Sequence, residues 1–245
     1  MENNLRSTNL DELDLSTVVT GNKLLRTSFT WMAVAMLLTT VVALVFAFVP
    51  GFSQILQSPS EDGGFRPTAF AYLVMFAPLV FVLIMSFALN KLSYAALLGL
   101  FIAYALVNGI AFSSIFFVYK LGSIVKVFLS TSALFAVMAI AGYTTKTDLS
   151  KLGTLLKIGL IGIVIAMLIN FFMHSARVDY IISVLGVIIF TGLTAYDVQK
   201  IKALGYQAEG SGLSSKLGIM GALTLYLDFI NLFLFLLRLF GGKKD

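Results

Sequence analysis

The chain has 245 residues, of which 59% are hydrophobic and only 12% are charged, whereas soluble globular domains average about 25% charged residues. Its net charge of +5 comes from lysines and arginines that stand singly or in pairs near the ends of apolar runs, so it does not predict a nucleic-acid-binding face. The absence of cysteine excludes disulfides, thiolate metal sites and thiol nucleophiles.

Apolar residues fall in seven long runs, and a helix needs about 20 mostly apolar residues to cross the hydrocarbon core of a bilayer. The runs are continuous rather than alternating, which excludes the strands of a membrane β-barrel. The predicted spans cover residues 29–49, 68–89, 94–118, 122–143, 155–173, 180–198 and 217–240. We therefore predict an all-α integral membrane protein, a seven-transmembrane-helix bundle that forms one domain over residues 29–241.

The segments at the two ends of the chain are polar. Residues 1–28 mix both signs of charge without sustained apolar periodicity, which predicts a disordered tail, and residues 242–245 are expected to form a short second tail. Ten lysines and arginines lie on the side of the N-terminus, against four on the other side before the C-terminal tail. The positive-inside rule then predicts a cytoplasmic N-terminus and, with seven spans, a C-terminus outside.

Motifs of soluble enzymes are absent. The sequence has no phosphate-binding loop, no dinucleotide fingerprint and no HExxH, and its single histidine rules out a pair of histidine ligands. We expect a protein that is not an enzyme and holds no resident cofactor or metal.

Two aspartates stand out inside or beside the apolar runs. Asp228 lies near the middle of the last run, where a carboxylate costs about 2.5–3.5 kcal/mol and is normally paired or functional. Asp197 is predicted to end the sixth helix, and since the two helices are consecutive, a meeting of Asp197 with Asp228 is geometrically easy. A purely structural hydrogen bond to a neighbouring helix is the alternative. Thr224 and Asn231 share the face of Asp228, and Asn108 is a further polar residue within a span.

The two aspartates lie in the second and third of three ordered motifs, at 142–150 (GYTTKTDLS), 194–202 (TAYDVQKIK) and 225–237 (LYLDFINLFLFLL). These motifs resemble the transmembrane Bax inhibitor motif family, the Bax inhibitor-1-like membrane proteins. The resemblance implies seven helices with the seventh central, pH-dependent calcium leak, and a functional aspartate pair at Asp197 and Asp228. It also implies an arginine at the end of the second helix that latches one aspartate. Residues 85–91 contain no arginine, so Lys91 is the candidate substitute.

Two carboxylates in contact at low dielectric cannot both be charged at low cost, so they tend to share a proton and titrate as a unit. Protonation is expected to favour a closed pair, and loss of the proton to open it. The predicted function is a pH-sensitive calcium leak channel or slow calcium/proton exchanger, with calcium bound transiently at Asp197 and Asp228.

The expected partners are the lipid bilayer, calcium and protons, and the expected location is the bacterial inner (plasma) membrane. Two other functions stay open. In a regulatory protein, resembling a cell-death suppressor or a modulator of a membrane protease, the aspartates would be structural and the N-terminal tail would bind the partner. The third candidate is a generic proton-coupled transporter.

Overall fold

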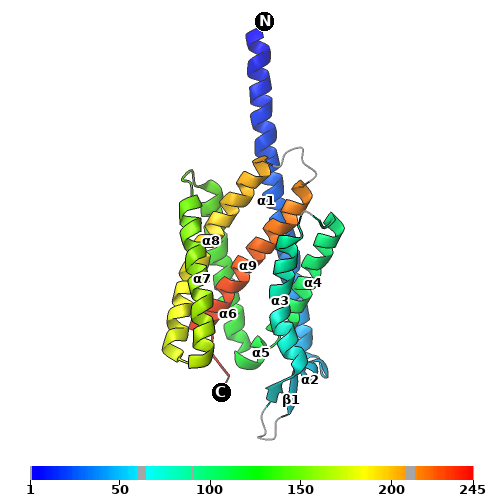
Figure 1. The fold of residues 1–245 in the computed structure, drawn as a ribbon, viewed down its shortest axis with the longest axis vertical. Coiled ribbons are helices and arrows are strands. Elements are labelled where there is room, and N and C mark those ends of the chain that lie inside the picture. Colours follow the sequence, from blue (N-terminus) through cyan, green and yellow to red (C-terminus); the bar gives the residue numbers. More distant parts are fainter. Residues whose placement is uncertain (1, 60–64, 90, 208–212, 245) are drawn as a thin grey trace. The chain divides into compact units, whose positions relative to one another are not determined.

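The computed structural model describes residues 2–59, 65–89, 91–207 and 213–244, with side chains from Lys23 onward except those of residues 59 and 65. In chain order (Figure 1), its elements are α1 (Glu2–Phe48), α2 (Phe52–Leu56), β1 (Gln57–Pro59), β2 (Phe65–Pro67), α3 (Ala69–Phe87), α4 (Tyr94–Phe112), α5 (Ile115–Val118), α6 (Leu121–Thr144), α7 (Ser150–Met173), α8 (Ala176–Gln207) and α9 (Ser214–Phe240).

Seven stretches of the described chain are long and apolar enough to cross a membrane, which confirms the predicted all-α membrane protein. They are Lys23–Phe48, Ala69–Phe87, Tyr94–Val118, Leu121–Thr144, Ser150–Met173, Ala176–Gln207 and Ser214–Phe240. The largest difference from the prediction is in the sixth span, which continues nine residues past its expected end at residue 198.

Polar side chains fix where several of these helices begin and end. Thr68 and Ser93 cap α3 and α4, because each hydroxyl accepts a hydrogen bond from the backbone N–H three residues later, at 3.2 Å. At the end of α7, His174 adopts a left-handed backbone conformation with φ of 52°, and the side-chain oxygen of Asn170 accepts from the N–H of Ser175 at 3.1 Å. The apolar runs are therefore bounded by local capping.

The third span contains a break that the apolar pattern did not predict. The hydroxyls of Ser113 and Ser114 donate to the carbonyls of Ile110 and Ala111, each at 2.7 Å. Serine hydroxyls compete with the backbone for helical carbonyls. The helix accordingly stops at Phe112 and resumes as the short α5.

Helix α1 begins at Glu2 and so includes the backbone of residues 2–28, for which the sequence predicted a disordered tail. The side chains before Lys23 lie outside the described part of the chain. The domain boundary at residue 28 stays a prediction.

The sequence predicted one domain over residues 29–241, whereas the helices group into two compact units. Unit 1 comprises Met1–Thr30 and Val127–Leu239, and unit 2 comprises Trp31–Lys126 and Phe240–Asp245. Helix α1 passes from one unit to the other at Thr30. Apolar runs show which segments are helical but not which helices pack together, so a sequence pattern cannot reveal this division.

Unit 1 contains the start of α1 together with most of α6 and all of α7 and α8, as well as α9 up to Leu239. Helices α7 and α8 run next to each other (Figure 1). Phe229 of α9 packs edge-to-face against Phe128 and Phe135 of α6, with ring centroids 5.4 Å apart in both cases. In the most apolar 18-residue stretch of α9, 67% is buried inside the protein. In each of the other spans the buried share of the corresponding stretch is at most 39%. A central helix needs such burial, and the central position itself stays a prediction.

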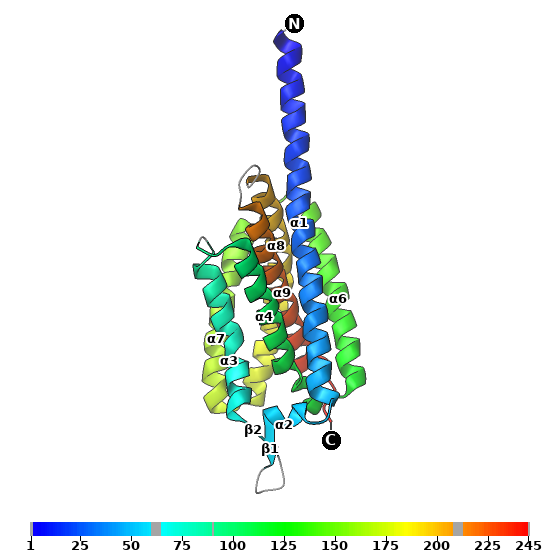
Figure 2. The ribbon, with the colours of Figure 1, turned by 90° about the vertical axis from the view of Figure 1, so that its right-hand side faces the viewer.

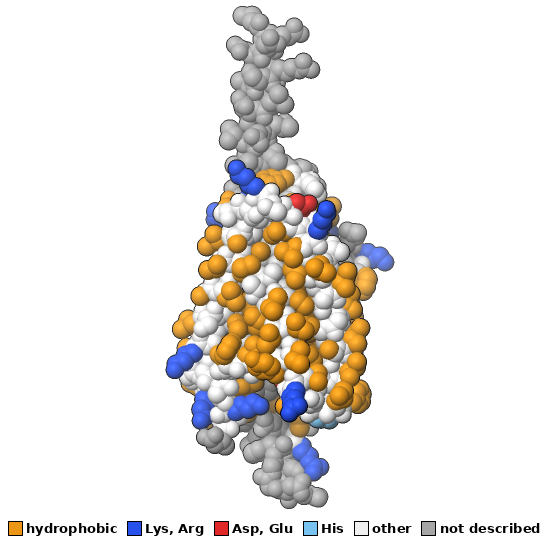
Figure 3. Space-filling model, turned by 90° about the vertical axis from the view of Figure 1, so that its left-hand side faces the viewer, with side chains coloured by type: hydrophobic (Ala, Val, Ile, Leu, Met, Phe, Trp, Pro, Cys, Tyr) orange, Lys and Arg blue, Asp and Glu red, His pale blue; other side chains and the backbone are white. Residues whose placement is uncertain are grey.

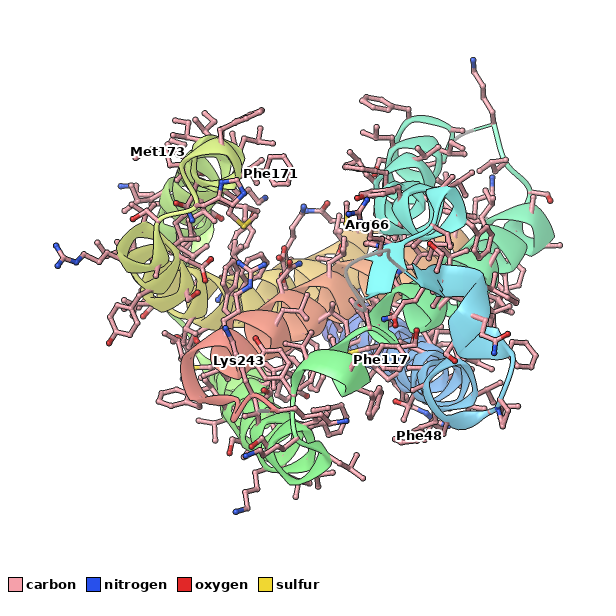
Figure 4. All side chains as sticks on the ribbon, turned by 90° about the horizontal axis from the view of Figure 1, so that it is seen from below. Phe48, Arg66, Phe117, Phe171, Met173 and Lys243 are labelled. Carbon is pink, nitrogen blue, oxygen red and sulfur yellow. The ribbon has the colours of Figure 1, made fainter. Side chains whose placement is uncertain are left out.

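Unit 2 is built around α3, α4 and the second half of α1. Helices α3 and α4 lie next to each other (Figure 2), and the hydroxyl of Thr39 on α1 donates to the carbonyl of Ala105 on α4 at 2.9 Å. Strands β1 and β2 pair antiparallel between α2 and α3. Figure 4 looks onto the end of the unit where Phe48 and Phe117 are labelled, and there the rings of Phe48 and Phe116 lie 5.5 Å apart.

Residues 242–244, in the predicted short tail, pair with the segment before α6. The N–H of Lys120 donates to the carbonyl of Gly242, and the N–H of Lys244 to the carbonyl of Val118, both at 2.9 Å. Tyr119 and Lys243 form the antiparallel bridge between them.

Exposed apolar side chains cover the outer surface of the spans. On the face drawn in Figure 3, hydrophobic side chains occupy the middle, and lysines and arginines lie toward the two ends. Helix α7 presents Leu155, Ile161, Leu168 and Phe172 to the outside along its length. This distribution suits contact with lipid tails in the middle and with headgroups at the ends.

Candidate functional site

Two aspartates of unit 1 meet in the protein interior. Asp197 on α8 is 6% exposed and Asp228 on α9 is 4% exposed. Their carboxyl groups lie close enough to interact with each other. The second oxygen of Asp228, Oδ2, is buried and has no hydrogen-bond partner among the described residues. A buried polar atom without a partner costs free energy, so this arrangement needs a reason.

The expected position of Asp197 at the end of its helix is wrong. Helix α8 continues to Gln207, so Asp197 lies two to three turns inside it. The segment after Asp197 loses its apolar character but remains helical, and it binds its surroundings through Gln199, which contacts the loop after α6, and Lys202, which contacts the last turn of α6. Hydropathy marks where the apolar run ends, not where the helix ends.

Close packing holds α8 against α9. Gly186 of α8 faces the ring of Phe235 on α9, where an added Cβ would lie 2.5 Å from a ring carbon. The rings of Phe190 and Phe235 are 5.9 Å apart, and Val198 and Leu225 are fully buried. This contact fixes the two helices that carry the aspartates.

A lysine of α7 lies beside the pair. The ammonium group of Lys157 donates to the hydroxyl of Tyr196 at 3.3 Å and lies 4.6 Å from the centre of the same ring. Its charge acts on both Asp197 and Asp228, whereas Lys200, one turn further along α8, acts on Asp197. The pair therefore interacts with cationic groups of both α7 and α8.

Helix α8 also clamps the loop between α6 and α7. The side chain of Gln199 accepts from the N–H of Leu149 and donates to the carbonyl of Thr147, both at 2.9 Å. Lys202 donates to the carbonyl of Tyr143 at 3.0 Å and lies over its ring. The motifs at 142–150 and 194–202 thus contact each other directly, close to the aspartate pair.

The same loop also binds the first residue of α7. The carboxylate of Asp148 accepts from the N–H of Ser150 at 2.9 Å. Hydrogen bonds from the Ser150 side chain and backbone hold the pKa of Asp148 below its ordinary value. This exposed carboxylate is therefore charged at neutral pH and favours the helix N-terminus that follows it.

Comparison with known proteins identifies the family. Residues 21–245 match the family described as Inhibitor of apoptosis-promoting Bax1, or Bax1-I. The chain belongs to the Bax1-I family. Inner membrane protein YbhL of Escherichia coli K12 is 43% identical to it over 216 residues, which cover 87% of this chain and 89% of that protein. An uncharacterized protein of Borreliella burgdorferi is 39% identical over 229 residues, which cover 93% and 95% of the two chains.

Another relative is an uncharacterized membrane protein of Streptococcus pyogenes, 44% identical over 163 residues that cover 66% of this chain and 70% of that protein. The family resemblance inferred from the three motifs is therefore confirmed. With its seven apolar helices, this Bax1-I chain is a multi-pass integral membrane protein.

The other predicted site residues of this Bax1-I chain do not bond to the pair. Thr224 donates to the carbonyl of Met220 at 3.0 Å and Asn231 to that of Leu227 at 2.8 Å, so both satisfy themselves within α9. Asn108 is buried in unit 2 and donates to the carbonyl of Tyr104 at 2.9 Å. Lys91 is an exposed residue of unit 2, between α3 and α4. The structure thus brings together Asp197 and Asp228 from the predicted set.

Sequence reasoning missed the roles of Lys157, Tyr196 and Gln199. Lys157 is the eighth residue of α7 and lies inside the predicted fifth span. The sequence contained a signal for this role, because a lysine beside a long apolar run usually pairs with a polar or negatively charged group. For Gln199 no sequence signal exists, because its partners are backbone groups about 50 residues away.

Among the described residues, no group of three or more His, Asp or Glu side chains converges as a metal site. The aspartate pair therefore offers two carboxyl groups and no further acidic ligand from that part of the chain.

Proposed function

We propose that this Bax1-I protein is a pH-sensitive calcium leak channel, or a slow calcium/proton exchanger, controlled by Asp197 and Asp228. The observation that carries the proposal is the burial of these two interacting carboxyl groups inside membrane-spanning helices. Carboxyl groups are expensive at this depth, and pairs of them are typical of proton and cation pathways.

The chemistry of the pair supplies the pH sensitivity. An ionised carboxylate only accepts hydrogen bonds, so two carboxyl groups that bond to each other must hold a proton between them. When that proton leaves, two negative charges stand in contact at low dielectric and repel each other. The proton therefore favours the closed pair, and its loss favours separation of α8 from α9 at this point.

The same pair suits a divalent cation in transit. Calcium binds oxygen ligands and usually takes six to eight of them, so two carboxylates are too few for tight binding. The unpartnered Oδ2 of Asp228 is an oxygen ready to accept a ligand. Weak, transient binding favours permeation over storage.

The orientation of this transporter follows from its charges. Ten lysines and arginines lie on the N-terminal side and four on the other before the C-terminal tail, so the N-terminus is proposed to be cytoplasmic. The pair then lies toward the cytoplasmic part of α8, and the proton it responds to comes from the cytoplasm. We propose the bacterial inner membrane as the location, by analogy with the printed name of the Escherichia coli relative.

A regulatory function is the second candidate, because the family description names an inhibitor. In that case a partner protein such as a membrane protease binds the N-terminal segment, and Asp197 and Asp228 only join two helices. Co-purification of a membrane protease that depends on residues 2–20, without calcium flux, would favour it.

Calcium flux into liposomes reconstituted with the purified protein separates the two. Flux through the wild type should depend on pH, and Asp228→Asn should abolish that dependence. Asp179→Asn is the matched control, since Asp179 lies near the start of the same helix as Asp197, is half-exposed, and its carboxylate forms an ion pair with Arg238 at 3.4 Å. Absence of flux at every pH in protein that has inserted normally would contradict the proposal.

A further inference from the structure

We propose that Lys157 is the counter-ion of the aspartate pair, held in place by Tyr196, and that it sets how readily the pair gives up its proton. This inference rests on the proposed proton sharing between Asp197 and Asp228. It assigns a positioning role to a residue of α7, a helix that carries neither aspartate.

The position of Lys157 in the membrane-spanning part of α7 requires an explanation. It is the eighth residue of α7, about 10 Å along the axis from the start of the helix. A lysine at such a depth extends toward polar groups or pairs with a negative charge. Its ammonium points to Tyr196, directly beside Asp197 in sequence.

Tyr196 holds the ammonium by two contacts. The hydroxyl accepts a hydrogen bond at 3.3 Å, and the ring lies 4.6 Å from the nitrogen, within range of a cation–π interaction. Gly153, one turn before Lys157, lets the ring of Tyr196 lie flat against α7, because a Cβ there would come within 2.5 Å of its ring atoms. The geometry thus fixes a flexible side chain in one place.

The charges around the pair are few enough to name. Helix α7 provides Lys157, and α8 provides Lys200, which faces Asp197 from the same helix. Between residues 127 and 145, α6 has no charged residue, and between residues 217 and 237, α9 has only Asp228. Lys157 acts electrostatically on both carboxyls.

The consequence is an electrostatic one. A positive charge beside the pair stabilises the negative state that remains once the shared proton has left. Without Lys157, that state is less favourable, and the pair should hold its proton up to a higher pH. The tyrosine matters because an ammonium free to move into water or headgroups would be screened.

Infrared spectroscopy of the full-length protein in lipid vesicles tests this directly. A protonated carboxyl group gives a C=O band that disappears as the pH rises, and its loss in Asp228→Asn assigns the band to the pair. In Lys157→Gln, the midpoint of this titration should move up by about one pH unit or more. Lys157→Arg keeps the charge and should restore most of the wild-type midpoint, and Tyr196→Phe should shift it in the same direction as Lys157→Gln by less.

Lys151→Gln is the matched control, because Lys151 lies on the same helix near Asp148 and should leave the midpoint unchanged. If the band titrates and Lys157→Gln leaves its midpoint in place, the counter-ion role is wrong and the proposed function stands. If the wild type has no band that Asp228→Asn removes, the proton sharing itself fails. A Lys157→Gln shift that Lys157→Arg reproduces in full would also overturn the inference, since the charge would not be its cause.

Discussion

The contact between Gly142 of α6 and Ala195 of α8 makes a quantitative prediction. A Cβ added at Gly142 would overlap the carbonyl of Ala195 and lie 2.7 Å from its Cα atom, whereas carbon atoms in contact stay about 3.5–4.0 Å apart. The obstacle is main chain and cannot rotate away. In Gly142→Ala, α6 and α8 must therefore separate by about 1 Å, two residues before Asp197.

The loss of unfolding free energy in Gly142→Ala can be estimated from two opposing effects. Overpacking costs about 1–3 kcal/mol, and contact with main chain places this site near the upper value. Replacing glycine by alanine in a helix returns about 1 kcal/mol. A net loss of about 2 kcal/mol should lower the melting temperature by about 4–8 °C for a chain of this size.

Thermal unfolding of the purified protein in detergent, followed by circular dichroism, measures this change. Gly162→Ala is the matched control, because Gly162 lies in α7 and no atom lies within 4 Å of the position its Cβ would take. Its melting temperature should be equal to or above that of the wild type. If Gly142→Ala melts as high as Gly162→Ala, the two helices do not make this contact.

Four further predictions follow from the loop, the ends of the chain and Asp148. Gln199→Ala removes both bonds to the loop at 145–149, so amide exchange there should speed up by about tenfold or more, and unchanged exchange would refute the clamp. Deletion of residues 2–20 should leave calcium flux intact, and loss of flux with normal insertion would count against it. A reporter active only in the cytoplasm should work at the N-terminus and be silent at the C-terminus, and the reverse would overturn the orientation. Because the folded pKa of Asp148 is lowered, its contribution to stability is full above its ordinary pKa and disappears as the pH falls through the lowered value, so melting of wild type and Asp148→Ala should converge in acid and not at neutral pH.

Much of the fold could be predicted because the bilayer imposes a simple rule on the sequence. Seven apolar runs gave seven spans, and the mid-membrane carboxylate at Asp228 directed attention to α9. The boundaries were less predictable where a polar side chain rather than hydropathy decides them. Ser113 and Ser114 break the third span, and α8 continues past residue 198 although its apolar run has ended.

Part of the candidate site, the aspartate pair, could be predicted from the sequence. Asp197 and Asp228 were predicted as a pair because their helices are consecutive, and the structure brings their carboxyl groups within interaction distance. Tyr196 and Lys157 are about 40 residues apart, and their contact depends on how α7 packs against α8. Apolar periodicity contains no information on that packing, so it could not place this cation near the pair.

The central claim is that Asp197 and Asp228 act as one titrating unit, and a double-mutant cycle on calcium flux against pH tests it most directly. The account predicts that Asp197→Asn and Asp228→Asn each flatten the pH profile, and that the double variant adds little beyond the larger single effect, since groups in one hydrogen-bonded network do not contribute independently. Asparagine keeps the shape and part of the hydrogen bonding, so a flattened profile in normally inserted protein reports on charge. A wild-type pH profile in both single variants, or strictly additive effects in the double variant, would contradict it.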